Sequence, residues 1–456
     1  MPRPSAPLLA VPLLVLAASA CEKVEQFRDA RRPATPHEAY LQGLHDAGLA
    51  NTALSQAWIH EAAEAVRTPR RVDLPFQEEG YIAPEAPEAV GYRFSLRRGQ
   101  TLNVRLRVNS PEGARVFLDL LRVAEDEADP PRPVEADTVP EGLVYEPFRD
   151  GEFLVRVQPE LLRGGEYAVI LTLDPALTFP VTGLGMSAIQ SGWGAARDGG
   201  RRSHEGVDIF ARRGTPVIAS VPGRVSRANV TRLGGKVVWL RDDRQNRSLY
   251  YAHLDSQAVA RGDVVRVGDT LGFVGNTGNA RTTPPHLHFG VYYRGEGAVN
   301  PAPFLRPPPG RLAGIDLDRS RYGRWVRVRD GEVHLRAGPS RGAGVLAELP
   351  RHTPARVTGG SAEWYRVTLP DGTQGYLAAR LTEDLTDLEP VVADAPAALH
   401  AAPHPTSPRT GRIASGETVP VVGRYAGYLQ VRSRDGGLGW LAAAPDPAAV
   451  ELAPDR

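Results

Sequence analysis

The chain has 456 residues, a formal net charge of +1, 42% hydrophobic residues and 23% charged residues. This length predicts three or four domains, and this composition is typical of folded rather than disordered protein. The balanced charge favours no polyanion-binding surface, so we expect no nucleic-acid partner. The single cysteine, Cys21, excludes an intramolecular disulfide and any zinc site built on several thiolates. A metal in this chain must therefore be held by His, Asp or Glu.

Residues 1–20 predict a signal peptide. Arg3 gives a basic start, Leu8 to Ala18 form an apolar stretch too short to span a bilayer, and small residues precede Cys21. The ending ASAC resembles a bacterial lipoprotein signal, which implies that Cys21 is acylated and anchors the chain to a membrane. The alternative is ordinary cleavage beside Cys21 and secretion. Both interpretations place the mature chain in the cell envelope or outside the cell.

The first two folded segments differ in the period of their apolar residues. Residues 21–72 are rich in helix formers with apolar residues three and four apart, which predicts a helical segment. From residue 73 the period becomes two, as in the stretch LNVRLRV that starts at Leu102. Such alternation is typical of half-buried antiparallel strands, so we predict a β-sandwich over residues 73–176. The acidic stretch 125–137 is predicted to be a solvated loop.

The C-terminal part contains an internal repeat behind a proline-rich linker, residues 307–320. LRAGPS at Leu335 matches LHAAPH at Leu399, and DGTQGYLAA at Asp371 matches DGGLGWLAA at Asp435, both at an offset of 64 residues. Two blocks in one register indicate duplication. Each copy resembles a bacterial SH3-type domain, which implies a small β-barrel that binds the cell wall. The two domains are predicted over residues 321–384 and 385–445.

Residues 177–306 carry three short motifs whose side chains could bind a metal or take part in catalysis. In PPHLHFG, His286 and His288 are two apart, so a strand would present both on one face, although such a pair can also be inert. In SHEGVDIF, His204 precedes Asp208 at a turn that leads into a strand. A carboxylate among apolar neighbours needs a metal or a cation, and an arginine partner is the alternative to a metal. In YYAHLDS, His253 is weak evidence alone.

Together, the order H-x-x-x-D, A-H-L and H-x-H resembles the signature of the lysostaphin-type zinc endopeptidases, which cut peptidoglycan cross-bridges. The flanking stretches 191–194, 206–225 and 265–280 are similar to that family as well. The likeness covers about residues 185–305. It implies a lysostaphin-like antiparallel β peptidase domain, so the whole chain is predicted to be mainly β and multidomain.

The resemblance also implies roles for five residues. His204, Asp208 and His288 would bind one Zn²⁺ per chain and leave an open position for water. His253 and His286 would be catalytic, one taking a proton from the water and the other stabilising the oxyanion or protonating the leaving amine. Which histidine does which stays open at this point.

Two positions depart from the family pattern. The loop before the H-x-H ends in Pro284-Pro285, where the family often has Ser-Thr-Gly-Pro. Gly234 stands where many members carry a tyrosine at the rim of the cleft, so another group would have to take that place. Both departures bear on specificity and rate more than on metal binding.

The expected function is that of an exported zinc endopeptidase, which uses a metal-activated water on peptidoglycan stem peptides or cross-links. The expected partners are peptidoglycan, the membrane through the lipid anchor, and a protein of wall remodelling. One alternative is a non-catalytic wall-binding protein that activates another hydrolase, although such relatives lack one or more of the five residues. Another is a zinc amidase that cuts beside muramic acid.

Overall fold

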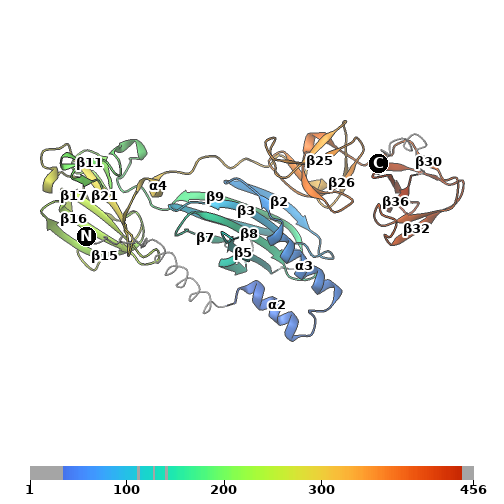
Figure 1. Ribbon diagram of the computed structural model, residues 1–456, viewed down its shortest axis with the longest axis horizontal. Helices are drawn as coiled ribbons and strands as arrows, with labels where there is room; N and C mark the ends of the chain where they lie inside the picture. Colours follow the sequence, from blue (N-terminus) through green and yellow to red (C-terminus); the bar gives the residue numbers. More distant parts are fainter. Residues whose placement is uncertain (1–33, 110–112, 114, 127–128, 139–141, 444–456) are drawn as a thin grey trace, which may run out of the picture.

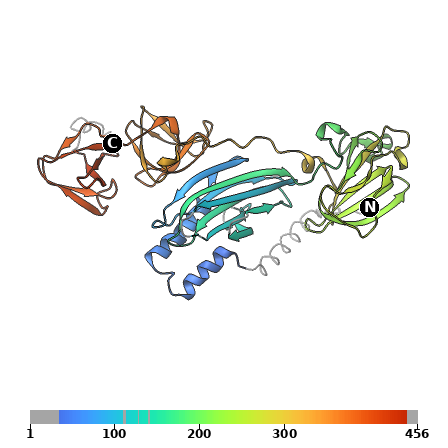
Figure 2. The same cartoon turned by 180° about the vertical axis from the view of Figure 1, so that it is seen from behind.

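The computed structural model describes residues 34–109, 113, 115–126, 129–138 and 142–443. The predicted signal peptide and Cys21 lie outside these residues. The described chain is mainly β, as predicted, and its folded parts follow one another along the longest axis of the molecule (Figure 1). The reverse view shows the same row, with the sandwich between the region of the histidine motifs and the two C-terminal repeats (Figure 2). Within the described residues, no helix combines the length and the apolar character that a membrane crossing requires.

Two helices form the N-terminal segment, α2 (Pro36–Asp46) and α3 (Ala53–Arg67). Thr35 starts α2 with a capping box, in which its hydroxyl accepts from the Glu38 amide and the Glu38 carboxylate accepts from the Thr35 amide. Trp58 of α3 is 1% exposed and packs on the sandwich. Burial of this large ring fixes both helices on the sheet.

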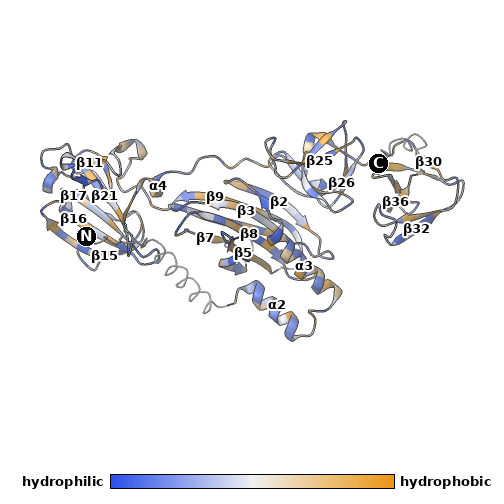
Figure 3. Cartoon of the chain, in the orientation of Figure 1, coloured by the Kyte–Doolittle hydropathy of each residue, from blue (hydrophilic) through white to orange (hydrophobic). Residues whose placement is uncertain are grey.

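The β-sandwich consists of two mainly antiparallel sheets whose inner faces form one core. The predicted alternation is confirmed along LNVRLRV, where Leu102, Val104 and Leu106 are buried. Figure 3 shows the matching change between hydrophobic and hydrophilic residues along the strands. The first sheet is β1 (Arg70–Arg71), β3 (Val90–Leu96), β8 (Gly151–Pro159), β5 (Val116–Arg122) and β6 (Arg132–Thr138), in that order. The second contains β2 (Phe76–Ile82), β9 (Gly165–Pro175), β4 (Gln100–Asn109) and β7 (Leu143–Tyr145).

The prediction of a loop over residues 125–137 is wrong in its second half. Residues from Arg132 onward form β6, which pairs with β5 at the edge of the first sheet. Charge and proline content do not exclude an edge strand, since only one of its sides needs ladder hydrogen bonds.

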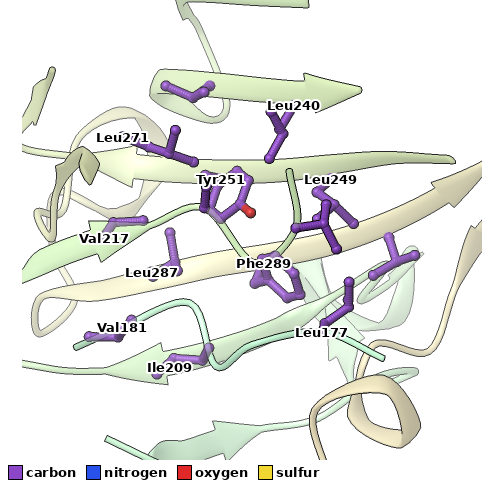
Figure 4. Packing of buried hydrophobic residues seen from close by; sticks show 14 of the residues in the cluster. Leu177, Val181, Ile209, Val217, Leu240, Leu249, Tyr251, Leu271, Leu287 and Phe289 are labelled. Atoms are coloured by element: carbon purple, nitrogen blue, oxygen red, sulfur yellow. The ribbon is translucent and has the colours of Figure 1, made fainter. Parts of the chain in front are cut away.

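The region with the histidine motifs is built on an eight-stranded antiparallel sheet. Leu287 and Phe289 point into its core with Ile209 and Tyr251 (Figure 4). His288 lies between them on the same strand, so it and His286 must face the opposite side of the sheet. The strands are β10 (Ile189–Ser191), β13 (Val207–Phe210), β21 (His286–Tyr293), β17 (Arg247–Leu254), β16 (Gly235–Asp242), β15 (Gly223–Thr231), β19 (Val264–Val265) and β22 (Gly297–Val299).

Smaller elements complete this region. They are a second sheet of β14 (Pro216–Ile218), β20 (Thr270–Phe273) and β18 (Ser256–Gln257), the hairpin β11 (Ala196–Arg197) and β12 (Arg202–Ser203), and the short helix α4 (Ala302–Leu305).

The two C-terminal repeats each fold as a small β unit. The first unit shares a sheet with the sandwich, because β26 pairs with β2 through Glu79 and Gly80. Its strands are β23 (Trp325–Val328), β24 (Val333–Arg336), β25 (Val345–Leu349), β26 (Pro354–Ser361), β27 (Trp364–Thr368), β28 (Gln374–Ala378) and β29 (Thr382–Asp384). The second unit contains β30 (Val391–Val392), β31 (Ala397–His400), β32 (Arg409–Ile413), β33 (Thr418–Val419), β34 (Val421–Tyr425), β35 (Tyr428–Arg432) and β36 (Leu438–Ala442).

Candidate metal centre and catalytic cleft

Strand register brings the three motifs together on one face of the large sheet. Asp208 of β13 lies directly opposite His288 of β21, and Ala252 of β17 lies opposite His288 on its other side. Directly opposed residues have Cβ atoms about 4.5–5.5 Å apart, so Asp208 and His288 must meet. His204 comes from the loop between β12 and β13 and reaches the same place.

The geometry of these three side chains fits a zinc ion. His204 Nε2 lies 2.9 Å from His288 Nδ1, and Asp208 Oδ1 lies 3.0 Å from each of these two nitrogens. Tetrahedral zinc with bonds of about 2.0–2.1 Å places its ligands roughly 3.3 Å apart, so a shift of a few tenths of an ångström would admit the ion. Within the described residues, this is the one group of three or more His, Cys, Asp or Glu side chains placed to hold a metal.

Neighbouring groups orient the outer atoms of this cluster. His204 Nδ1 donates to the carbonyl oxygen of Gly192 over 2.8 Å, which leaves Nε2 for a metal. Arg197 Nη2 donates to Asp208 Oδ2 over 2.5 Å and to Ser191 Oγ over 2.7 Å. The second carboxylate oxygen of Asp208 is therefore held by a cation while the first faces the two imidazoles. Such outer contacts usually strengthen metal binding.

Ionisation of the cluster also suits a divalent metal. Burial alone would raise the pKa of Asp208, but hydrogen bonds and charge interactions with His204 and His288 outweigh it and hold that pKa well below its usual range. Burial lowers the pKa of His288 despite the nearby carboxylate of Asp208. An ionised carboxylate beside a neutral imidazole is the protonation state that a metal requires.

Gly206 makes room for the His288 ring. A Cβ atom at this position would lie 2.6 Å from His288 Cε1 and 2.6 Å from the carbonyl oxygen of Phe289. Real Cβ atoms do not approach so closely, so any side chain at residue 206 would displace the imidazole. The glycine of the SHEGVD motif is therefore a requirement of packing.

The two remaining histidines are held through their Nδ1 atoms. His253 Nδ1 donates to the carbonyl oxygen of Thr277 over 2.9 Å, and His286 Nδ1 donates to that of Pro284 over 2.9 Å. Both imidazoles thus keep Nε2 for the cleft. Their ring centroids are 5.1 Å apart, and His286 stacks on Phe210. Pro284, which had no clear role from sequence, therefore supplies the acceptor that orients His286.

His253 has two further unusual properties. Burial, together with the charges of His286 and His288, lowers its pKa to about 4, so the ring is neutral near pH 7 and can accept a proton. Its backbone φ is +64°, in the left-handed region that costs a non-glycine residue energy. The backbone is held there by a hydrogen bond from His253 N to Gly234 O of 2.7 Å.

All five side chains line one cleft of about 620 Å³. Every residue of its lining belongs to the segment from Ser191 to Tyr292, so no described residue of the sandwich or the repeats lies in it. A larger cavity of about 1180 Å³ lies between α3 and the first repeat, but it contains none of the five residues. The smaller cleft is therefore the candidate site, because it contains the five predicted side chains and the larger cavity does not.

Sequence reasoning missed two residues of this cleft. Arg197 carries no motif and reaches Asp208 only through the fold, so nothing in the sequence singled it out. The interpretation of Asp208 offered a metal or an arginine partner as alternatives, and the structure shows an arginine together with three side chains that could hold a metal. Tyr250 could have been found, since it lies two residues before Ala252 and so shares the face that meets His288.

Comparison with known proteins agrees with this geometry. Residues 202–301 match the model of peptidase family M23, and residues 331–383 and 395–444 match that of the bacterial SH3 domain. The chain contains a peptidase family M23 domain. The predicted C-terminal SH3-type repeats are confirmed by the same comparison.

Three curated proteins resemble the M23 domain of this chain. The L-Ala--D-Glu endopeptidase of Bacillus subtilis is 41% identical over 128 residues, which are 26% of this chain and 39% of that protein. The DD-carboxypeptidase/endopeptidase Mpg of Neisseria meningitidis is 40% identical over 24% of each chain. Lysostaphin of Staphylococcus simulans is 36% identical over 29% of this chain and 27% of that protein. This chain thus spans less than half the length of each relative.

Among solved structures, the catalytic domain of lysostaphin from Staphylococcus simulans is 35% identical and has a TM-score of 0.23, covering 25% of this chain and 88% of that domain.

Proposed function

We propose that this protein is an exported, zinc-dependent endopeptidase that hydrolyses peptide bonds in peptidoglycan. The observation that carries the proposal is the set of three ligand atoms, 2.9–3.0 Å apart, in a cleft where two further imidazoles keep Nε2 available. His204, Asp208 and His288 would hold the ion. Zinc bound there would lower the pKa of its water and polarise the scissile carbonyl.

His253 and His286 would do the proton chemistry. Because His253 is neutral, its Nε2 can take a proton from the attacking water, and we therefore propose His253 as the general base. His253 would then pass that proton to the leaving amine, and His286, fixed by the Pro284 carbonyl, would donate from Nε2 to the developing oxyanion when it carries a second proton taken from solvent. The two rings, 5.1 Å apart, are close enough to act on one water and one carbonyl.

The substrate class is supported by the names of the relatives. Two of them are named as an L-Ala--D-Glu endopeptidase and a DD-carboxypeptidase/endopeptidase, and the third is lysostaphin. The first two names state different activities, so the proposal extends to the wall peptide and not to one bond. The two SH3 domains would hold the enzyme on the wall, and Cys21 would carry its lipid anchor.

The test is metal content together with digestion of sacculi. The full-length chain should contain about one zinc ion and release peptides, identified by mass spectrometry as cleaved between amino acids. His288→Ala should lose both properties, whereas His334→Ala, at an exposed histidine of the first SH3 domain, should lose neither. A wild-type chain that binds zinc yet leaves sacculi intact would contradict the proposal.

A further inference from the structure

Beyond the five predicted residues, Tyr250 lies beside the metal cluster on the open face of the sheet. It pairs with Gly290 of β21, one pleat away from the pairing of Ala252 with His288. Side chains two apart on a strand share a face, so Tyr250 lies on the side of the ligands. Its ring centroid is 5.8 Å from that of His288, and it lines the same 620 Å³ cleft.

The hydroxyl of Tyr250 occupies the space above Gly234. A Cβ atom at residue 234 would lie 2.1 Å from the Tyr250 hydroxyl oxygen. Gly234 also contacts the backbone of His253, because its carbonyl oxygen accepts a hydrogen bond from the His253 amide. Residue 234 has no side chain and so places no polar group on this part of the cleft wall. The Tyr250 hydroxyl lies there instead.

Hydrogen bonding leaves this hydroxyl able to donate. The Gly234 amide donates to Thr231 Oγ1 over 3.0 Å, so the Thr231 hydroxyl can direct its own proton to the Tyr250 oxygen, with which it hydrogen-bonds. Tyr250 then has a proton of its own to donate.

The ring is held from the other side by aromatic neighbours. Trp239 lies 4.4 Å and Tyr292 6.3 Å from it, measured between ring centroids. Contacts of this kind restrict the ring to one orientation. The hydroxyl is thus presented by a fixed side chain, which lowers the entropy cost of binding a ligand.

We propose that Tyr250 is a further substrate-contacting residue, whose hydroxyl donates a hydrogen bond to a carbonyl oxygen of the peptide next to the scissile bond. This inference rests on the proposed peptidase function. The Tyr250 hydroxyl would supply the polar group that Gly234, without a side chain, does not provide on the cleft wall.

The test compares Tyr250→Phe with Tyr81→Phe, a matched control at a half-buried tyrosine of β2 in the sandwich, outside the cleft. Substrate is a purified cross-linked muropeptide dimer, and the zinc-loaded full-length chain is used for kinetics. Tyr250→Phe should lower kcat/KM about 3- to 10-fold, the effect of one neutral hydrogen bond, mainly through KM. Zinc content and Tm should not change, and Tyr81→Phe should match the wild type.

A second variant reaches the same hydroxyl from its other side. Gly234→Ala should push the Tyr250 oxygen out of place and lower kcat/KM similarly, and the double variant should lose no more than either single variant. A loss through general damage would instead appear in Tm and would add up in the double variant. Fully additive losses in kcat/KM would overturn the inference.

Calorimetry of the same muropeptide binding to the metal-free chain tests the role of Tyr250 independently of the proposed peptidase function. Weaker binding by Tyr250→Phe supports the inference even if the zinc-loaded wild type hydrolyses nothing, an outcome that overturns the proposed function alone. Hydrolysis and binding at wild-type levels by Tyr250→Phe overturn the inference and leave the function standing. A wild type that neither binds nor hydrolyses the dimer overturns both.

Discussion

Arg366 of the first SH3 domain and Glu78 of the sandwich form an ion pair 2.8 Å long, and both side chains are fully buried. Tyr92 and Tyr376 donate to the Glu78 carboxylate, and Arg366 donates to the Tyr167 hydroxyl. Together with the pairing of β2 and β26, this network makes the first SH3 domain and the sandwich one continuous structure. The proline-rich segment before that domain is therefore not its only attachment.

We expect Arg366→Met to destabilise this joint strongly. Removing one partner leaves Glu78 buried without its counter-charge, which costs about 3–5 kcal/mol. Chemical denaturation should show this loss in the free energy of unfolding. Arg319→Met is the matched control, because Arg319 pairs with the adjacent Glu79 but is 63% exposed, and its loss should cost less than about 1 kcal/mol. Equal effects of the two variants would show that burial of the pair is unimportant.

Arg197→Met should weaken zinc binding without abolishing it. The guanidinium holds Asp208 Oδ2, and losing such an outer contact typically costs 10- to 100-fold in metal affinity. Competition with a chelating dye measures this change directly. Arg213→Met, which removes an exposed pair with Asp255, should leave the zinc affinity as it is. Unchanged affinity in Arg197→Met would mean that Asp208 needs no such support.

Gly206→Ala should disrupt the metal centre from within the backbone. The new methyl group would lie 2.6 Å from His288 Cε1, so the imidazole must leave its position opposite Asp208. We expect at least a tenfold loss of zinc affinity, measured by the same dye competition. Gly185→Ala is a suitable control, since a Cβ atom there meets nothing within 4 Å and the residue lies outside the lining of the cleft. A Gly206→Ala chain with normal zinc affinity would contradict this account.

The helical segment should loosen in mild acid because of His37. Burial, and secondarily the charge of Arg156, lowers the pKa of this histidine to about 4 from its ordinary 6.5. Between these values the unfolded chain binds more protons than the folded one, so stability falls as pH falls. Two-state linkage gives about 2 kcal/mol lost between pH 7 and pH 5.

Hydrogen exchange of the α2 amides at the two pH values measures this loss. His37→Gln should remove most of the pH dependence, whereas His45→Gln, at an exposed position of the same helix, should keep it. A pH response that persists in His37→Gln would assign the effect to another group.

The alternation of apolar residues was sufficient to predict which faces are buried, because period two and period 3.6 are local properties of a chain. It placed Leu102, Val104 and Leu106 in the sandwich core and His286 and His288 on the opposite face from Leu287. It failed at residues 132–137, where charge and proline suggested a loop. An edge strand tolerates both, and its pairing with β5 depends on a partner that local sequence does not reveal.

At the site, the motifs and their resemblance to the lysostaphin-type family predicted five side chains, and the tertiary structure places all five in one cleft, while their roles in binding and catalysis stay predictions for the experiments above. Only the fold decided that Asp208 faces both His288 and Arg197, that Pro284 orients His286, and that Tyr250 fills the space over Gly234. The reason is physical. A sequence pattern fixes the face on which a side chain lies, whereas the atom that it meets there depends on strands and loops up to 80 residues away.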